Sequence, residues 1–333
     1  MRSQITRDRL SGLISGYLLT QAIACAAGLE IADKLSAGPR TAAELATLAQ
    51  CSATHLKRVM RVLCNIGVFN EGASGYELTP TSEHLRRDRE GSLWPLAVFH
   101  GNELYRALGG LLDNVRSGIP AWQAVIGAPH WQYLLEHADR GAIFDSLMRQ
   151  NHHDHVQTMV SAYDFSAARV VVDVGGADGS LLQEILTVYP GASGILFDTP
   201  DVVKRARASV AWKARGSRCQ FVAGDFFEDI PTGGDVYLLR HILHDWDDER
   251  CVHLLRCCRE AMSDDARLLV IESLLDTERD ATYASLTDLG VMVIGGQERA
   301  SGEYERLLRE AGIAVTRFIS STTHASVIEA RAV

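Results

Sequence analysis

The stretch VVVDVGGADGSLLQEIL, residues 170–186, constrains the fold of this chain more than any other. It combines a valine-rich strand, a glycine-rich turn and the start of a helix. Strands that are apolar throughout are typical of parallel sheets covered on both faces. A glycine turn between such a strand and a helix is typical of nucleotide-binding α/β domains. The segment therefore predicts a parallel sheet, and it raises the question of which nucleotide the turn would hold.

Strands and helices alternate from residue 169 onward. Candidate strands lie at residues 169–175, 194–200, 219–227, 235–242 and 266–275, and helical stretches separate them. This alternation predicts a doubly wound α/β domain. A last pair, residues 314–321 and 324–331, is joined by a short turn and predicts an antiparallel hairpin at one edge of a mostly parallel sheet.

The glycine turn does not carry the dinucleotide fingerprint G-x-G-x-x-G. Counting from Gly175, Ala177 occupies the second glycine position and Ser180 the third. The pattern that fits is D-x-G-x-A-x-G, which begins at Asp173. A carboxylate at the strand end repels a pyrophosphate but suits an ammonium or sulfonium group. We therefore expect a nucleoside ligand without a diphosphate.

Acidic residues also end the next two predicted strands. Asp198 can accept hydrogen bonds from both ribose hydroxyls, Asp225 can accept from an adenine amino group, and Phe226 can cover the ring face. Taken singly, each aspartate fits a helix N-cap equally well. Three in series, at the carboxyl ends of consecutive strands, indicate the crevice where open α/β sheets bind ligands.

The N-terminal part has a winged-helix pattern. A helix follows Thr41, a second spans roughly residues 52–63, and after Gly67 come the short strands VFNE and YELT, turned at GASG. Such units often bind the major groove of DNA, so a transcriptional regulator is one alternative. The predicted recognition helix holds only four basic or histidine side chains: His55, Lys57, Arg58 and Arg61. A structural or dimerising use is favoured.

Composition limits the partners. The formal net charge of −9 and pI near 5.7 argue against binding to nucleic acid or anionic lipid. Seven cysteines without a CxxC pair, and a start without an apolar signal core, lead us to expect free thiols in the cytoplasm. Residues 10–29 are uncharged and long enough to span a bilayer. Their glycines and hydroxyl residues instead favour a helix buried in a soluble protein, swapped into a partner subunit.

The run HHDH, residues 152–155, invites a metal hypothesis. On a helix this spacing points the rings around the cylinder, and no cysteine or glutamate completes a ligand set. We expect no metal site there, nor elsewhere in the chain.

The segment LLRHILHDWDDERC follows the fourth predicted strand. Together with VVDVGGADGS, GILFDTPDVV, GDFFEDIP and the stretch around GGQER, it resembles the S-adenosylmethionine-dependent O-methyltransferases of the caffeate and plant-phenol type and their bacterial antibiotic-pathway relatives. The similarity spans nearly the whole chain. It implies a winged-helix dimerisation domain at residues 1–92, a helical linker and substrate-pocket region at 93–165, and a Rossmann-like catalytic domain at 166–333. It also implies a homodimer.

The resemblance implies roles for individual residues. His244 is the general base, flanked by the carboxylates of Glu272 and Glu298. The remaining expected contacts are, for the cofactor S-adenosylmethionine, Asp173, Gly175, Asp198, Asp225, Phe226 and Arg240, and, for the acceptor, Met148, Asp245 and Asp288. A neutral imidazole with a pKa near 6.5 suits proton removal from a phenol with a pKa of about 10. His241, one helical turn before the base, is interpreted as structural.

Two departures from the family pattern affect these expectations. Ala177 replaces a frequent glycine in the turn, and Gly290 stands where relatives often carry an asparagine that can touch the acceptor. The expected reaction is methylation of a hydroxyl on an aromatic or polyketide-type natural product. The alternative within the family is a protein that binds S-adenosylmethionine but catalyses decarboxylation, hydroxylation or a pericyclic step.

Overall fold

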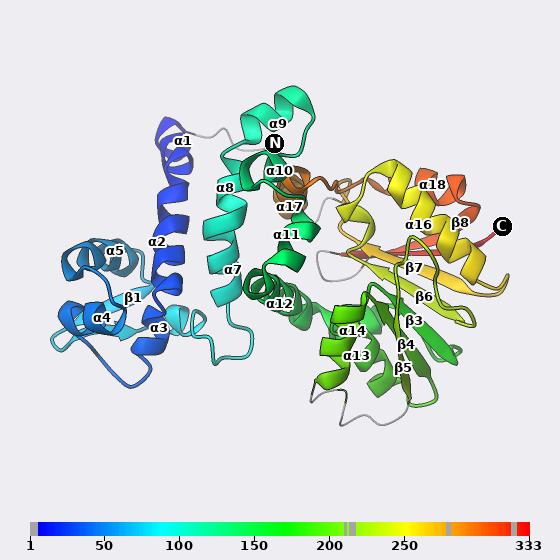
Figure 1. Cartoon of the computed structure of the whole chain (residues 1–333), viewed down its shortest axis with the longest axis horizontal. Helices are drawn as coiled ribbons and strands as arrows, with labels where there is room; N and C mark the ends of the chain where they lie inside the picture. Colours follow the sequence, from blue (N-terminus) through cyan, green and yellow to red (C-terminus); the bar gives the residue numbers. More distant parts are fainter. Residues whose placement is uncertain (1–5, 210–211, 213–217, 278–280, 321–324) are drawn as a thin grey trace. The chain divides into compact units, whose positions relative to one another are not determined.

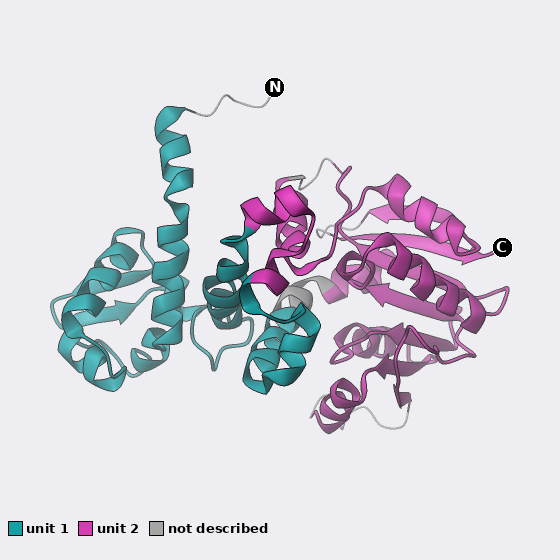
Figure 2. Ribbon diagram, turned by 45° about the horizontal axis from the view of Figure 1, so that its top comes forward, with its two compact units in different colours: residues 1–110, 125–150 teal, residues 111–124, 151–333 magenta. Residues whose placement is uncertain are grey.

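The structure is a computed structural model that describes residues 6–209, 212, 218–277, 281–320 and 325–333, with the backbone alone at 150–155 and 281. It divides into two compact units, residues 1–110 with 125–150, and residues 111–124 with 151–333 (Figure 2). The helical segment predicted at 93–165 contributes to both units. The side chains of the HHDH run lie outside the described residues.

The second unit is built on a seven-stranded sheet of order β5-β4-β3-β6-β7-β9-β8 (Figure 1). Its strands are β3 (Val170–Val174), β4 (Ser193–Asp198), β5 (Cys219–Ala223), β6 (Val236–Arg240), β7 (Arg267–Glu272), β8 (Ile313–Ser320) and β9 (Ser326–Ala332). The first five are parallel, and β9 pairs antiparallel with both β7 and β8. The predicted parallel sheet and its antiparallel edge hairpin are confirmed. All five parallel strands end earlier than predicted, and the largest difference is at β5, which ends at Ala223, so that Asp225 lies in the following turn.

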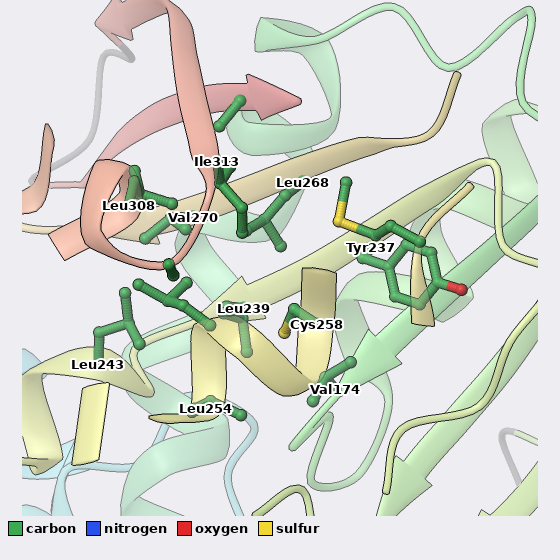
Figure 3. Close-up of a cluster of buried hydrophobic side chains, with 14 of the residues drawn as sticks. Val174, Tyr237, Leu239, Leu243, Leu254, Cys258, Leu268, Val270, Leu308 and Ile313 are labelled. Carbon is green, nitrogen blue, oxygen red and sulfur yellow. The ribbon is translucent and has the colours of Figure 1, made fainter. Parts of the chain in front are cut away.

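Helices cover both faces of this sheet. The end of α12 (Ala138–Ala162), α13 (Ser180–Val188) and α14 (Pro200–Ala208) pack on one face, and α16 (Asp248–Ala261) and α18 (Ser301–Glu310) pack on the other. The second unit also contains α9 (Leu111–Ser117), part of α10 (Ala121–Ile126) and α17 (Ala281–Ile294). Alternate residues of β3 serve the two cores: Val172 and Val174 pack with α16 and α18, and Val171 packs with α12 and α13. Figure 3 shows part of the first core. Burial on both faces explains why the central strands are mostly apolar.

The strand order creates a switch point at β3. The chain runs from β3 outward through β4 to β5, and then returns to add β6 on the other side of β3. Loops after β3, β4 and β6 leave the carboxyl edge of the sheet in diverging directions, which opens the crevice where such sheets bind ligands. Of the predicted cofactor residues, Asp173, Gly175, Asp198 and Arg240 lie at the ends of β3, β4 and β6 or directly after them, and Asp225 and Phe226 lie in the turn after β5.

The first unit contains the winged helix. Its helices here are α4 (Ala42–Leu48), with a capping box at Thr41, and α5 (Ala53–Asn65), and its wing is the antiparallel pair β1 (Phe69–Gly72) and β2 (Gly75–Leu78). Gly67 has a φ of 77°, which lets α5 end and the chain turn into the wing. The other elements are α1 (Arg7–Ile14), α2 (Gly16–Gly28), α3 (Ile31–Lys34), α6 (Pro80–Glu83), α7 (Trp94–Phe99), the π-helix η1 (His100–Leu104), α8 (Tyr105–Leu108) and α11 (His130–Glu136).

The long apolar N-terminal helix is formed, in two segments, α1 and α2. Within the described residues, the stretch Arg7–Gly28 is the one helix that is long and apolar enough to cross a bilayer, and only 11% of its most apolar window is buried. Large apolar side chains on it are exposed in the single chain: Leu10, Leu13, Ile14, Tyr17, Leu18 and Leu19. Contiguous exposed apolar surface of this kind marks an interaction site.

Candidate active site

The glycine turn after β3 has an unusual backbone. Gly175, Ala177 and Gly179 have φ values of 69°, 52° and 73°. A Cβ at Gly175 would lie 2.6 Å from Ile242 Cδ1, and one at Gly179 would lie 2.5 Å from the Trp212 ring. Glycine is therefore required at both positions for packing as well as for conformation. Ala177 adopts the same left-handed conformation at a steric cost.

The turn is tied to the end of β4. The N–H of Ala177 donates to Asp198 Oδ2 at 2.9 Å, and the N–H of Thr199 donates to Asp198 Oδ1 at 2.7 Å. These bonds fix the half-buried carboxylate of Asp198 beside the turn. Phe226 lies on another side, since its Cε1 is 3.5 Å from the position of a Cβ on Gly175. Asp225 is exposed, and its Oδ1 accepts from the N–H of Phe227 at 2.9 Å.

Asp173 and Arg240 lie at the ends of neighbouring strands. Burial raises the pKa of Asp173 to about 7, against the opposite pull of Arg240. Burial also lowers the pKa of Arg240 to about 10, against the pull of Asp173. Among the described residues, Arg240 Nε is buried without a hydrogen-bond partner. Buried donors are normally paired, and a polar ligand beside the glycine turn would supply a partner for Arg240 Nε.

His244 lies on the short 3-10 helix η2 (Leu243–Asp245), which follows β6. Glu272, at the end of β7, anchors this segment, because its Oε1 accepts from the N–H groups of Ile242, Leu243 and His244 at 3.1, 2.9 and 3.4 Å. On its other side, His244 Nδ1 donates to Glu298 Oε1 at 2.9 Å. Since a carboxylate only accepts, the proton is on Nδ1, and Nε2 is free to act as a base in the neutral ring.

Electrostatics around His244 differ from the sequence expectation of an ordinary imidazole. Burial lowers its pKa, but the carboxylates of Glu272, Asp245 and Glu298 outweigh burial and raise the pKa to about 10. Burial raises the pKa of Asp245 to about 7, while His244 acts in the opposite direction. Asp245 Oδ1 is 3.5 Å from His244 Nε2. The imidazolium form is thus strongly stabilised, and the ring of His244 is fully neutral only at alkaline pH.

His241 lies elsewhere than expected. It does not lie on a helix with His244. It follows β6 directly, with a φ of 50°, and its ring centroid is 5.3 Å from that of His244. Its Nδ1 is 3.5 Å from Glu272 Oε2. Glu272 therefore faces two imidazoles, and His241 belongs to the site.

Arg299 stabilises the loop that carries His244, and this role was not predicted from the sequence. Its side chain is fully buried and donates to Asp248 Oδ1 at 2.8 and 3.0 Å, and to the carbonyl oxygens of Leu243 and Trp246 at 3.0 and 2.8 Å. The available signal was its place after Glu298 in GGQER. An arginine has enough donors to fix several turns of a loop at once.

The expected acceptor residues are placed differently. Asp288, on α17, accepts the N–H of Glu298 at 2.9 Å, so this carboxylate positions the segment that carries Glu298. Asp245 lies beside His244 Nε2, where an acceptor hydroxyl would approach. Met148, on α12, is half-buried in the first unit. Contacts of these three residues with an acceptor stay predictions.

Comparisons with known proteins agree over most of the chain. Residues 108–314 match the O-methyltransferase domain and residues 11–88 the O-methyltransferase dimerisation domain. The phenazine O-methyltransferase of Lysobacter antibioticus is 38% identical over 321 residues, 96% of this chain and 94% of that enzyme. The mitomycin biosynthesis 6-O-methyltransferase of Streptomyces lavendulae is 35% identical over 314 residues, 93% and 90% of the two chains.

One solved structure shows the ligands of a relative. An O-methyltransferase from neocarzinostatin biosynthesis, in complex with S-adenosylmethionine and 2-hydroxy-5-methyl naphthoic acid, has a TM-score of 0.83 at 32% identity, covering 94% of this chain and 96% of that one.

Proposed function

Because the chain belongs to the S-adenosylmethionine-dependent O-methyltransferase family, we propose that His244 removes the proton from an aromatic hydroxyl as the oxygen is methylated. The observation that carries this proposal is the 2.9 Å hydrogen bond from His244 Nδ1 to the buried carboxylate of Glu298. It fixes the tautomer whose Nε2 can accept a proton. It also stabilises the imidazolium that forms when the proton arrives.

The two glutamates have different tasks. Glu272 fixes the backbone of the η2 segment through three N–H groups, and Glu298 orients the ring of His244. Both side chains are fully buried, so water does not screen their charge. The proton leaves the acceptor hydroxyl for His244 Nε2, and the new charge on the ring is balanced by these carboxylates.

The cofactor is S-adenosylmethionine, whose sulfonium supplies the electrophilic methyl group. The residues proposed to hold it are those around the glycine turn: Asp173, Gly175, Asp198, Asp225, Phe226 and Arg240. Two observations support this assignment: the left-handed turn at Gly175, which Phe226 approaches, and Arg240 Nε, which is buried and unpaired among the described residues. Asp198 is held with both oxygens directed by backbone N–H groups, ready to accept from a ribose.

The proposed acceptor is a hydroxyl on an aromatic or polyketide-type natural product. Relatives named for phenazine and mitomycin substrates support this class, as does the naphthoic acid bound in the neocarzinostatin-pathway enzyme. Methyl transfer to such a compound needs no reactive intermediate that the protein must stabilise. Rate acceleration then comes mainly from positioning and from the base.

The proposed assembly is a homodimer through the first unit. The matched dimerisation domain covers the exposed apolar helices α1 and α2. Burial of that face against a second copy explains why a long uncharged helix occurs in an acidic chain. All seven cysteines are free, which supports a cytoplasmic location.

Two variants test the proposal. His244→Ala should retain S-adenosylmethionine binding and lose methyl transfer by about two to four orders of magnitude, the contribution of a positioned general base. Asp198→Ala should weaken cofactor binding by about 1.5–3 kcal/mol, the range for hydrogen bonds to a charged group. Calorimetry and mass spectrometry of the product measure both, with His55→Ala, exposed on α5, as the control.

Two results would overturn the proposal. A folded His244→Ala enzyme that methylates near the wild-type rate would show that the acceptor ionises unaided. A wild-type enzyme that converts its substrate without consuming S-adenosylmethionine would place the chain in the non-methylating branch of the family.

A further inference from the structure

We propose that His241, His244 and Glu272 form a binding site for a divalent transition-metal ion of the Zn²⁺ type, and that the bound ion switches methyl transfer off. One donor atom of each of these three residues lies within 4.8 Å of the donor atoms of the other two. The inhibition depends on the proposed role of His244 as base, whereas the binding does not.

The spacing suits such an ion. His241 Nδ1 and His244 Nδ1 each lie 3.5 Å from Glu272 Oε2. Tetrahedral Zn²⁺ with ligands at about 2.0–2.2 Å separates neighbouring ligand atoms by roughly 3.3–3.6 Å. Both nitrogen-to-oxygen edges therefore have the length that coordination requires, and the donor atoms of the two histidines lie within 4.8 Å of each other.

The carboxylate of Glu272 is oriented so that one of its oxygens can bind a metal ion. Glu272 Oε1 is occupied by three backbone N–H groups, and this holds the side chain in one orientation. Glu272 Oε2 is buried and has no hydrogen-bond partner within the described part of the chain. The site therefore offers three protein ligands, His241, His244 and Glu272, and a water molecule or an anion would complete a tetrahedral set. Hydrogen bonds that orient a ligand from behind are a regular feature of metal sites.

The charge of the cluster also favours a cation. Three carboxylates face His244, from Asp245 and Glu272 at 3.5 Å and from Glu298 at 2.9 Å. Two of them are fully buried. The nearby Arg299 is engaged with Asp248 and with loop carbonyls. Two imidazoles with carboxylates select Zn²⁺, Ni²⁺ or Cu²⁺ over Mg²⁺ and Ca²⁺, which prefer oxygen ligands alone.

Metal binding would prevent His244 from acting as the base, because it would change the tautomer of the imidazole. An ion bound to His244 Nδ1 takes the lone pair on that nitrogen, so the neutral ring must carry its proton on Nε2. Nε2 is the atom that would accept the proton of the acceptor hydroxyl. The metal-bound enzyme therefore keeps its fold and its cofactor site but loses its base.

Of the three proposed metal ligands, His241 is the one that has no assigned step in the proposed methyl transfer. Its side chain lies beside Glu272 and His244. His241 follows β6 directly and has a left-handed backbone conformation, with a φ of 50°. Such a conformation is costly for most residues, although asparagine tolerates it. His241→Asn therefore removes the imidazole with little strain on the turn.

The test uses full-length wild type, His241→Asn and the control His55→Ala, first treated with chelator. Co²⁺ replaces Zn²⁺ as a spectroscopic probe, and its visible absorption reports nitrogen and oxygen coordination independently of activity. Zn²⁺ inhibition of methyl transfer is measured against each variant's own metal-free rate. Wild type and His55→Ala should bind Co²⁺ and be inhibited reversibly, and His241→Asn should need at least about tenfold more of either ion.

The outcomes separate the two proposals. Absence of Co²⁺ binding, or equal binding by His241→Asn and wild type, would overturn the metal site and leave methyl transfer by His244 untouched. Binding that depends on His241 without inhibition would overturn the switch and count against His244 as the base. If the same Zn²⁺ concentration inhibited His55→Ala and His241→Asn, the inhibition would be assigned to the free thiols. That result would overturn the proposed switch.

Discussion

Gly296 packs against the backbone of His244, the proposed base, and replacing it tests whether this contact sets the position of His244. Gly296 lies between α17 and Glu298, and a Cβ at this residue would lie 2.2 Å from the carbonyl oxygen of His244 and 3.2 Å from Asp245 Cα. Both are atoms of the backbone, so no flexible side chain can move aside. The carbonyl of His244 is also the acceptor for the N–H of Gln297, at 2.7 Å.

The size of the effect follows from the overlap. A distance of 2.2 Å is about 1 Å short of an ordinary contact, so Gly296→Ala must push the two segments apart by about that much. Overpacking of this kind costs about 1–3 kcal/mol of stability. Moving a catalytic group by about 1 Å can reduce turnover by about 100-fold. Activity should therefore fall much further than stability.

The assay compares kcat, cofactor affinity and denaturant unfolding for Gly296→Ala and the control Gly290→Ala. Gly290 lies within α17, and a Cβ there meets nothing within 4 Å. The control should gain about 0.5–1 kcal/mol of stability, since alanine favours a helix interior over glycine. Cofactor affinity should change little in either variant. A Gly296→Ala enzyme with at least half of the wild-type kcat would refute the claim that this contact sets the position of His244.

Three further predictions concern the surroundings of the site. Arg299→Met should lower the free energy of unfolding by about 2–4 kcal/mol in chemical denaturation, because buried carbonyls lose their donor. Arg306→Ala, at a half-buried position, should have a far smaller effect, and equal effects would contradict a clamping role for Arg299. Ala177→Gly should raise the free energy of unfolding by about 0.5–1 kcal/mol, because the relief of left-handed backbone strain outweighs the free-energy cost of a more flexible unfolded chain. A lower Tm in a thermal melt would refute this. Glu298→Gln should move the rising limb of the profile of kcat against pH to lower pH in chelator-treated enzyme. Glu298 helps to raise the pKa of His244, so its loss lets the neutral ring form at lower pH. An unmoved limb would mean that another group titrates.

Local pattern was sufficient for much of the fold. The valine-rich strand of residues 170–174 must be covered on both faces, and the alternation that follows allows little besides a doubly wound sheet. The capping residue Thr41 and the glycine at 67 likewise set the limits of helices by local chemistry. Each of these features depends on neighbours in the sequence, and such features can be predicted from the sequence alone.

The electrostatics of the site were decided by tertiary structure. An imidazole in an unknown environment is expected to titrate near its ordinary pKa, and the sequence gives no distance between His244 and any carboxylate. The fold brings Glu272 from β7 and Glu298 from the segment after α17 to the same ring, and that convergence raises its pKa to about 10. A pKa depends on burial and on charges distant in the chain.

The same reason explains why His241, Arg299 and Asp288 were assigned other roles or none. A histidine three residues before another suggests one face of a helix, yet the left-handed turn after β6 places His241 beside Glu272. Arg299 and Asp288 would pass for surface charges in the sequence, but they bind backbone groups of the loops that carry His244 and Glu298. Sequence was sufficient to propose which residues carry the chemistry, and tertiary structure decided how they are held, because buried polar groups find their partners across the fold and not along the chain.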